Sequence, residues 1–347
     1  MAAWAALKKR GGTEPAPHVP PFFPLAKSTA PGRCAAVESF RARPWVGVMT
    51  GARVLTAAVL IPMAVAAVLW TDTWVIAGLV AGVLILCLYE FFRLANAAGL
   101  KGHPRWTTAC ALFLVGLQWL EASYQGIWVH SDYGLLFAPG HSPAPPDLAL
   151  VVFLLGASLL AVLGKRPLNE ILPGLAADCA ALVLVAFPLG LVVRLHGMHA
   201  NGRWVLLFLL VVLWTGDTLA YFAGRAVGRH KMAPEISPGK TWEGAAANLV
   251  GSWLAMIPVA YPGILPVRYL WLGGYLRPAH MFALVTLANL AGQLGDLTES
   301  AYKRSAGVKD SGTLLPGHGG MLDRLDSLIF AAPVVWYYFS MLLPAAG

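Results

Sequence analysis

The chain has 347 residues, of which 58% are hydrophobic and only 12% are charged, and its formal net charge at pH 7 is +8. Its mean hydropathy of +0.65 is too high for a soluble globular domain, in which apolar residues make up about 45–50%. The composition therefore excludes an ordinary soluble enzyme and favours a membrane protein.

Residues 1–48 differ from the rest of the chain, because they are rich in Pro, Ala and charge and show no apolar helical period. We predict a disordered, basic, Pro-rich cytoplasmic tail. No apolar region follows the early run of Lys8, Lys9 and Arg10, so we do not expect this tail to be a signal peptide. An alternative is that translation starts at Met49. Residues 49–347 are expected to form a single polytopic membrane domain.

Long apolar runs follow the tail and are long enough to cross a bilayer as helices. We therefore predict an all-α fold with about nine transmembrane helices, of which the third is short enough to be a re-entrant or interfacial helix instead. Pro188 and Pro258 are expected to kink their helices. The predicted spans are 53–70, 74–95, 106–120, 147–164, 173–194, 203–224, 242–262, 279–298 and 322–343.

The basic residues indicate how these spans are oriented. Assigning alternate loops to alternate faces puts 21 Lys and Arg residues on the N-terminal side and four on the opposite side. This distribution predicts a cytoplasmic N-terminus and an extracytoplasmic C-terminus. The net charge then reflects topology and attraction to anionic lipids, and we expect no nucleic-acid partner.

The first polar block, Trp214 to Gly244, follows the sixth predicted span. Asp217 and Gly224 lie on one helix face by their spacing. Ser237 and Pro238 are expected to open a turn. Thr241 could then cap the next helix, with main-chain N–H groups facing an anion. The spacing is not that of a Walker A loop, and an ordinary basic loop is the alternative.

The second polar block, Gly295 to Ser327, holds nine charged side chains and one histidine. Asp296 and Lys303 share a helix face with either Glu299 or Ser300 between them, and Asp323 begins the last span. Carboxylates from two helices need a cation, and hard oxygen ligands suit Mg²⁺. The interleaved Lys and Arg suit a polyphosphate. The block therefore indicates phosphoryl or nucleotidyl transfer, although a purely structural salt-bridge cluster is the alternative.

Isolated ionisable residues at membrane depth are also candidates for function. For Glu90 and Asp178, which stand alone in their spans, a structural partner is at least as reasonable as a catalytic role.

The segment from Ser300 to Asp326 resembles the signature of phosphatidate cytidylyltransferases, also called CDP-diacylglycerol synthases. That signature runs Ser, two residues, Lys-Arg, four residues, Lys-Asp, then Pro-x-His-Gly-Gly and Asp-Arg-hydrophobic-Asp, and every polar position matches. One departure is Tyr302, where an aliphatic residue or Phe is usual. Residues 216–229 and 237–244 also resemble this family, and the resemblance extends from about Val48 to the C-terminus.

The resemblance implies the conversion of CTP and phosphatidate to CDP-diacylglycerol and pyrophosphate in the inner membrane, with the active site at the cytoplasmic face. It implies that Asp296 and Asp323 bind Mg²⁺, with room for a second cation, and that Lys303, Arg304 and Lys309 hold phosphates. A homodimer is a further expectation. Substrate contacts are implied at Ser300, Asp310, His318, Gly319, Gly320, Arg324, Asp326, Asp217, Lys240, Thr241 and Glu243.

Two other functions stay open at this point. A polyprenol or lipid kinase would also bring a nucleotide to a lipid, but would transfer the γ-phosphoryl group. An ion-coupled transporter would place its acids near the bilayer midplane, whereas these charges cluster at one face.

Overall fold

The structure is a computed structural model that describes residues 46–127, 147–164, 167–198, 202–257, 278–312 and 319–342. The chain divides into two units, Met1–Val48 and Met49–Gly347, and the fold below is that of the second. The predicted tail, the expected kink at Pro258 and the candidate site residue His318 lie outside the described residues.

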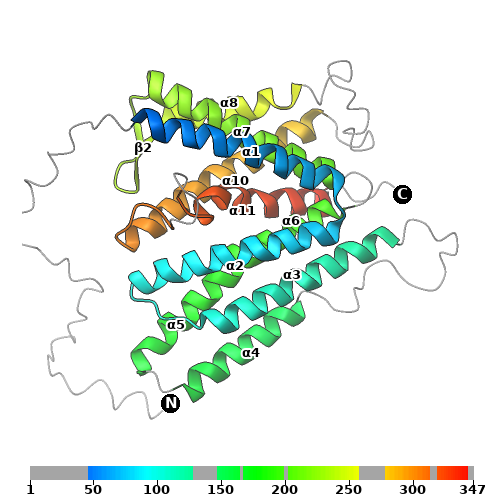
Figure 1. The fold of residues 1–347 in the computed structure, drawn as a ribbon, viewed down its shortest axis with the longest axis vertical. Coiled ribbons are helices and arrows are strands. Elements are labelled where there is room, and N and C mark those ends of the chain that lie inside the picture. Colours follow the sequence, from blue (N-terminus) through cyan, green and yellow to red (C-terminus); the bar gives the residue numbers. More distant parts are fainter. Residues whose placement is uncertain are drawn as a thin grey trace, which may run out of the picture. The chain divides into compact units, whose positions relative to one another are not determined.

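The described residues are mainly helical, which confirms the predicted fold class in outline (Figure 1). The elements in chain order are α1 (Val46–Trp70), α2 (Thr73–Ala97), α3 (Pro104–Ile127), α4 (Asp147–Leu163), α5 (Leu168–Ala181), the π-helical turn η4 (Leu182–Ala186), α6 (Phe187–His196), α7 (Gly202–Val227), β1 (Lys231–Ala233), β2 (Ser237–Thr241), α8 (Trp242–Leu254), α10 (Pro278–Ser305), α11 (Leu322–Tyr337) and the π-helical turn η7 (Tyr338–Leu342).

Three helical segments are long and apolar enough to cross a membrane, namely Thr73–Ala97, Leu168–His196 and Gly202–Val227. Two shorter apolar segments, Ala58–Trp70 and Leu148–Leu163, accompany them. These helices are those of a membrane protein, while the full set of nine spans stays a prediction. The third predicted span is longer than expected, since α3 has 24 residues.

The fifth predicted span is a continuous helical rod that contains one irregular turn. α5 passes through η4 directly into α6, and Pro188 is the second residue of α6. Because proline has no N–H group, it cannot make the regular helical hydrogen bond at its own position. The π-helical turn η4, which is wider than an α-helical turn, ends two residues before Pro188. The irregularity therefore lies next to the proline at which the sequence predicted a kink.

The β-hairpin between α7 and α8 corrects the sequence prediction in one detail. β1 and β2 are antiparallel, with Lys231 opposite Thr241 and Ala233 opposite Ser237. Ser237 and Pro238 therefore lie in a strand and do not open a turn. In a two-stranded hairpin both strands are edges, so a proline can be accommodated where no ladder hydrogen bond is needed.

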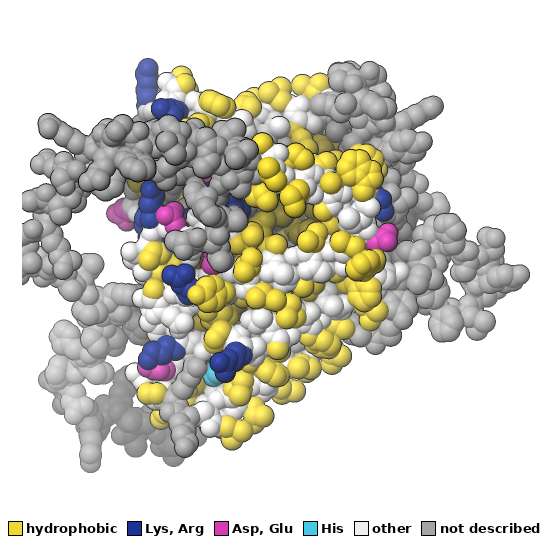
Figure 2. All heavy atoms as spheres, viewed as in Figure 1, with side chains coloured by type: hydrophobic (Ala, Val, Ile, Leu, Met, Phe, Trp, Pro, Cys, Tyr) yellow, Lys and Arg dark blue, Asp and Glu magenta, His cyan; other side chains and the backbone are white. Residues whose placement is uncertain are grey.

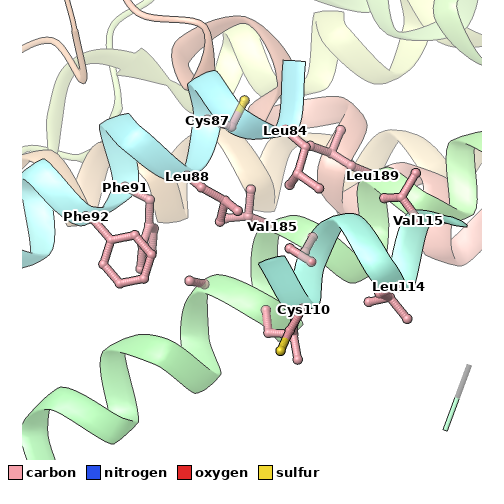
Figure 3. Packing of buried hydrophobic residues seen from close by; sticks show 14 of the residues in the cluster. Leu84, Cys87, Leu88, Phe91, Phe92, Cys110, Leu114, Val115, Val185 and Leu189 are labelled. Carbon is pink, nitrogen blue, oxygen red and sulfur yellow. The ribbon is translucent and has the colours of Figure 1, made fainter. Parts of the chain in front are cut away.

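α10 and α11 lie side by side, with α2 and α6 packed against α11, and α7 and α8 packed against α10 (Figure 1). Buried residues of α2, α3, η4 and α6 form one hydrophobic cluster, which includes Leu84, Leu88, Val185 and Leu189 (Figure 3). A second cluster joins α6, α7, α10 and α11. The first cluster also includes Leu322 and Ile329 of α11, and the second holds α10 and α11 together.

The surface in Figure 2 separates charged from apolar side chains. Lys, Arg, Asp and Glu side chains lie mainly toward the ends of the helices, and hydrophobic side chains cover the region between them. This pattern is that of helices whose middle portions face lipid and whose ends face water.

Candidate active site

The close packing of α10 against α11 determines the geometry of the site. A Cβ atom on Gly295 would overlap the carbonyl oxygen of Asp326 and would come within 3.0 Å of Phe330 Cβ. The two helices can therefore approach closely at this level. As a result, the acidic residues of α10 and α11 face a common space.

The first group of charges consists of Glu299, Lys303 and Asp323. Lys303 Nζ lies 2.6 Å from Asp323 Oδ1 and also forms an ion pair with Glu299. All three side chains are largely buried, with exposed fractions of 14% for Lys303, 11% for Asp323 and 5% for Glu299. Burial alone would lower the pKa of the Lys303 ammonium, but its two carboxylate partners raise it above its ordinary value.

The carboxylate of Asp323 is also held by the backbone. Its Oδ2 atom accepts hydrogen bonds from Gly320 N at 2.8 Å and from Ser311 N at 3.1 Å. Ser311 Oγ lies 3.0 Å from the same oxygen. These donors belong to the loop between α10 and α11, of which residues 306–312 and 319–321 are described and which we call the signature loop. The signature loop thus fixes the orientation of Asp323 before any ligand arrives.

The second group lies about one helical turn away and contains three carboxylates. Lys240 Nζ from β2 lies 3.0 Å from Asp296 Oδ1. Asp217 and Asp326 interact electrostatically with both Asp296 and Lys240. The Asp296 side chain is 42% exposed, so its carboxylate stays accessible to a ligand. The structure therefore brings together the two polar blocks that the sequence analysis placed on one face.

A chain of buried polar side chains supports Asp217 from behind, and the sequence analysis missed it. Asn248 Nδ2 donates to Asp217 Oδ1 at 3.0 Å. Asn289, which is 1% exposed, in turn donates to Asn248 and to Ser252. The signal was available, because Asn residues inside apolar spans usually form hydrogen bonds between helices.

The hairpin is anchored to the site by several of the predicted site residues. Thr241 caps α8 by accepting a hydrogen bond from Gly244 N at 3.1 Å, as predicted. Glu243 binds the ring of His230 at 2.6 Å. Arg304 Nε donates to the Ile236 carbonyl at 3.0 Å. Their predicted contacts with substrate stay predictions, but each residue helps to hold Lys240 against α10.

The signature loop supplies the remaining candidates. Gly319 has a φ of 79°, a conformation that favours glycine. Gly320 lies beside it and donates to Asp323, as described above. Ser300 is buried in α10, and the side chains of Lys309, Asp310 and Arg324 are exposed.

The predicted metal ligands, Asp296 and Asp323, fall into the two neighbouring groups. In the part of the chain that the structure describes, no three or more His, Cys, Asp or Glu residues are arranged to hold a metal ion. The chemistry of the site nevertheless fits a hard cation, because three carboxylates in the second group face one ammonium group. The sharing of such a cation by Asp296 and Asp323 stays a prediction.

An apolar pocket adjoins both groups of charges. Hydrophobic side chains of α2, η4 and α11 line it, and Glu299, Tyr302 and Asp326 border it. Tyr302 packs edge-to-face against Phe91, with ring centroids 6.3 Å apart. The hydrophobic lining residues are Phe91, Leu184, Val185, Leu322, Ile329 and Phe330.

The fold and the site together define a membrane protein with a charged, carboxylate-rich centre beside an apolar pocket. Residues 51–342 match the model of the cytidylyltransferase family, so the chain belongs to that family. A phosphatidate cytidylyltransferase of Haemophilus influenzae is 32% identical over 290 residues, which cover 77% of this chain and 96% of that protein. One of Pseudomonas aeruginosa is 34% identical over 295 residues, which cover 85% and 97%. One of Bacillus subtilis is 39% identical over 150 residues, which cover 43% and 52%.

Proposed function

We propose that this protein transfers the cytidylyl group of CTP to phosphatidate and releases pyrophosphate, producing CDP-diacylglycerol. The observation that supports this most directly is the convergence of Lys240, Asp296, Lys303 and Asp323 from two distant segments. These residues belong to the segments that resemble the family signature. The names of the relatives favour this reaction over the lipid kinase and the transporter.

In this reaction an oxygen of the lipid phosphate attacks the α-phosphorus of CTP. A new P–O bond forms, and the bond from the α-phosphorus to the β-phosphate oxygen breaks as pyrophosphate leaves. The second pKa of a phosphate monoester is about 6, so the nucleophile is already anionic and needs no general base. The main obstacle is the repulsion between two anions, and the site must provide positioning and charge neutralisation.

The charge and location of each residue in the site determine whether it can position a substrate or neutralise its charge. Lys240 and Lys303 place ammonium groups beside the carboxylates, where they can bind phosphate oxygens when the substrates enter. Arg304 and Lys309 lie at the exposed end of α10 and in the following loop. Mg²⁺ held by Asp296 and Asp323 would neutralise charge on the triphosphate.

The location of the site follows from the predicted topology. We propose nine membrane spans with the N-terminus in the cytoplasm, so that the C-terminal end of α10 and the start of α11 face the cytoplasm. In a bacterial cell the protein would then lie in the inner membrane and take CTP from the cytoplasmic pool. The bilayer and a second copy of the chain are its proposed partners.

The decisive experiment uses purified protein in detergent with CTP, phosphatidate and Mg²⁺. Release of pyrophosphate together with CDP-diacylglycerol is the expected result. Release of a nucleoside diphosphate would instead identify a lipid kinase. The variant Asp323→Asn, assayed beside the wild type, controls for a contaminating activity.

A further inference from the structure

Glu90 is a carboxylate buried in the apolar helix α2, and the reaction described above does not use it. Its exposed fraction is 0%. Its Oε1 atom accepts a hydrogen bond from Met321 N at 2.9 Å. Its Oε2 atom accepts from Leu322 N at 2.9 Å and from Ser311 Oγ at 2.8 Å. A buried acid costs free energy unless such partners satisfy it, and here all three donors come from the signature loop and the start of α11.

The signature loop leaves space for this carboxylate. A Cβ atom on Gly312 or on Gly320 would collide with the Glu90 carboxyl group. A side chain at either position would therefore displace the carboxylate or the loop. Two glycines thus lie against the Glu90 carboxyl group, and Ser311, Met321 and Leu322 direct three donors at its oxygens.

The same loop orients Asp323. Ser311 Oγ lies 2.8 Å from Glu90 Oε2 and 3.0 Å from Asp323 Oδ2, so one hydroxyl group is shared between the two carboxylates. Gly320 N donates to Asp323, while the next two N–H groups, of Met321 and Leu322, donate to Glu90. Successive backbone donors therefore bind the two acids in turn, and displacing one acid must disturb the other.

We propose that Glu90 is a positioning residue for the cytidylyl transfer, because it fixes the start of α11 and thereby the orientation of Asp323. The backbone N–H groups of Met321 and Leu322 can only donate hydrogen bonds, and each is paired with one carboxyl oxygen of Glu90. Because Glu90 is fully buried, we expect it to contact neither substrate. The proposal rests on the proposed function, since Asp323 is the group whose orientation matters for the reaction.

The variant Glu90→Gln tests this role with almost no change in volume. Glutamine has one acceptor oxygen and one NH₂ group, so the NH₂ group must face the backbone N–H of either Met321 or Leu322. We expect kcat to fall about 10- to 100-fold, as for other residues that orient a catalytic group. The KM for phosphatidate should change less than about threefold, because Glu90 does not contact the lipid.

A matched control is Asp178→Asn. Asp178 is also 0% exposed and also accepts hydrogen bonds at the beginning of a helix, from His103 N at 2.6 Å and Thr107 Oγ1 at 3.0 Å. Asp178 lies in α5, and its hydrogen-bond donors lie at the start of α3. Helix α3 carries none of the proposed catalytic residues. Asp178→Asn should lower the thermal unfolding temperature comparably, but kcat of the folded protein should stay near the wild-type value.

Hydrogen exchange gives a readout that does not depend on activity. In Glu90→Gln, the amide of either Met321 or Leu322 should exchange at least about tenfold faster than in the wild type, because the NH₂ group of glutamine replaces the acceptor of one of them. In Asp178→Asn, faster exchange should instead appear at His103. If the wild type proves inactive, the proposed function fails, while this comparison still decides whether Glu90 holds α11.

Two results would overturn the inference. One is a Glu90→Gln protein with wild-type kcat and unchanged exchange at residues 321 and 322. The other is equal loss of kcat in Glu90→Gln and Asp178→Asn, which would indicate a general effect of a buried acid. Should Glu90→Gln fail to accumulate, Ser311→Ala removes only the shared hydroxyl. It should lower kcat about fivefold, and a wild-type kcat in that variant would also contradict the proposal.

Discussion

Asp296 and Asp323 have very different surroundings although both are proposed metal ligands. Asp323 is bound by Lys303 and by two backbone N–H groups, whereas Asp296 is 42% exposed beside Lys240. This difference suggests a fixed ligand and an accessible one, which together can receive a nucleotide-bound cation. The two residues would then act as one unit.

We predict that Asp296→Asn and Asp323→Asn each lower turnover at least about 100-fold, because each removes one charge from a preorganised site. The double variant should be little worse than either single variant. The measurement is CDP-diacylglycerol formation over a range of Mg²⁺ concentrations. Glu170→Gln, which changes an acid paired with Lys101 at 2.8 Å, should leave turnover unchanged. Effects that multiply would show that the two residues act independently.

Lys240 carries the positive charge that faces three carboxylates in the second group. We predict that Lys240→Met raises the KM for CTP about tenfold, the loss expected for one hydrogen bond to a charged group. Initial rates over a range of CTP concentrations measure this effect. Lys101→Met, which removes another lysine that is paired with a carboxylate, is the control and should keep a normal KM. A larger effect on kcat than on KM would instead assign Lys240 to the transition state.

At the scale of elements, the close contact of α10 with α11 depends on Gly295. We predict that Gly295→Ala destabilises the protein by about 1–3 kcal/mol, as for overpacking in a core, and lowers activity because both acidic faces shift. Gly78→Ala is the control, because a Cβ at Gly78 of α2 meets no atom within 4 Å. That change should stabilise the helix by about 0.5–1 kcal/mol. Thermal unfolding in detergent compares the two variants, and equal stability would contradict the packing argument.

Local signals predicted some elements well and missed others. The cap at Thr241 was predictable because an N-cap depends on neighbouring residues in the chain. The hairpin at 231–241 was not, because its short strands have no alternating apolar pattern and Pro238 argues against a strand. The contact between Glu299 and Lys303 follows from their spacing on one helix. The contacts of Lys240 with Asp296 and of Glu90 with the signature loop depend on helix packing, which periodicity leaves undetermined.

At the scale of the whole molecule, the predicted topology can be tested directly. A reporter fused after Gly347 should be extracytoplasmic, and one inserted near Gly312 should be cytoplasmic, because 21 of the 25 Lys and Arg residues fall on one predicted side. Accessibility to a membrane-impermeant reagent in intact cells measures both positions. A cytoplasmic C-terminus would mean that the number of spans differs by one from nine.

Composition predicted the membrane class, and the apolar runs located most of the described helices. The greater length of α3 was not predicted, because hydropathy measures only how apolar a run is, whereas an irregularity near η4 was predicted from Pro188. Similarly, the charged side chains were identified from the sequence, but their division into two groups was not. That division depends on how α10 and α11 are aligned along their length, to which Gly295 contributes.

The fit of Glu90 between two glycines also constrains how this sequence can change over evolutionary time. A residue larger than glycine at position 312 or 320 can be tolerated only if the side chain at position 90 becomes shorter. A glutamate can in turn be restored at position 90 only after positions 312 and 320 have become small enough to leave space for it. Glu90 and Met321 are 231 residues apart in the chain. Substitutions at positions 90, 312 and 320 should therefore occur together in distant homologues, as expected for residues in contact. A lineage that lost one of them alone would have to hold the start of its last helix in another way.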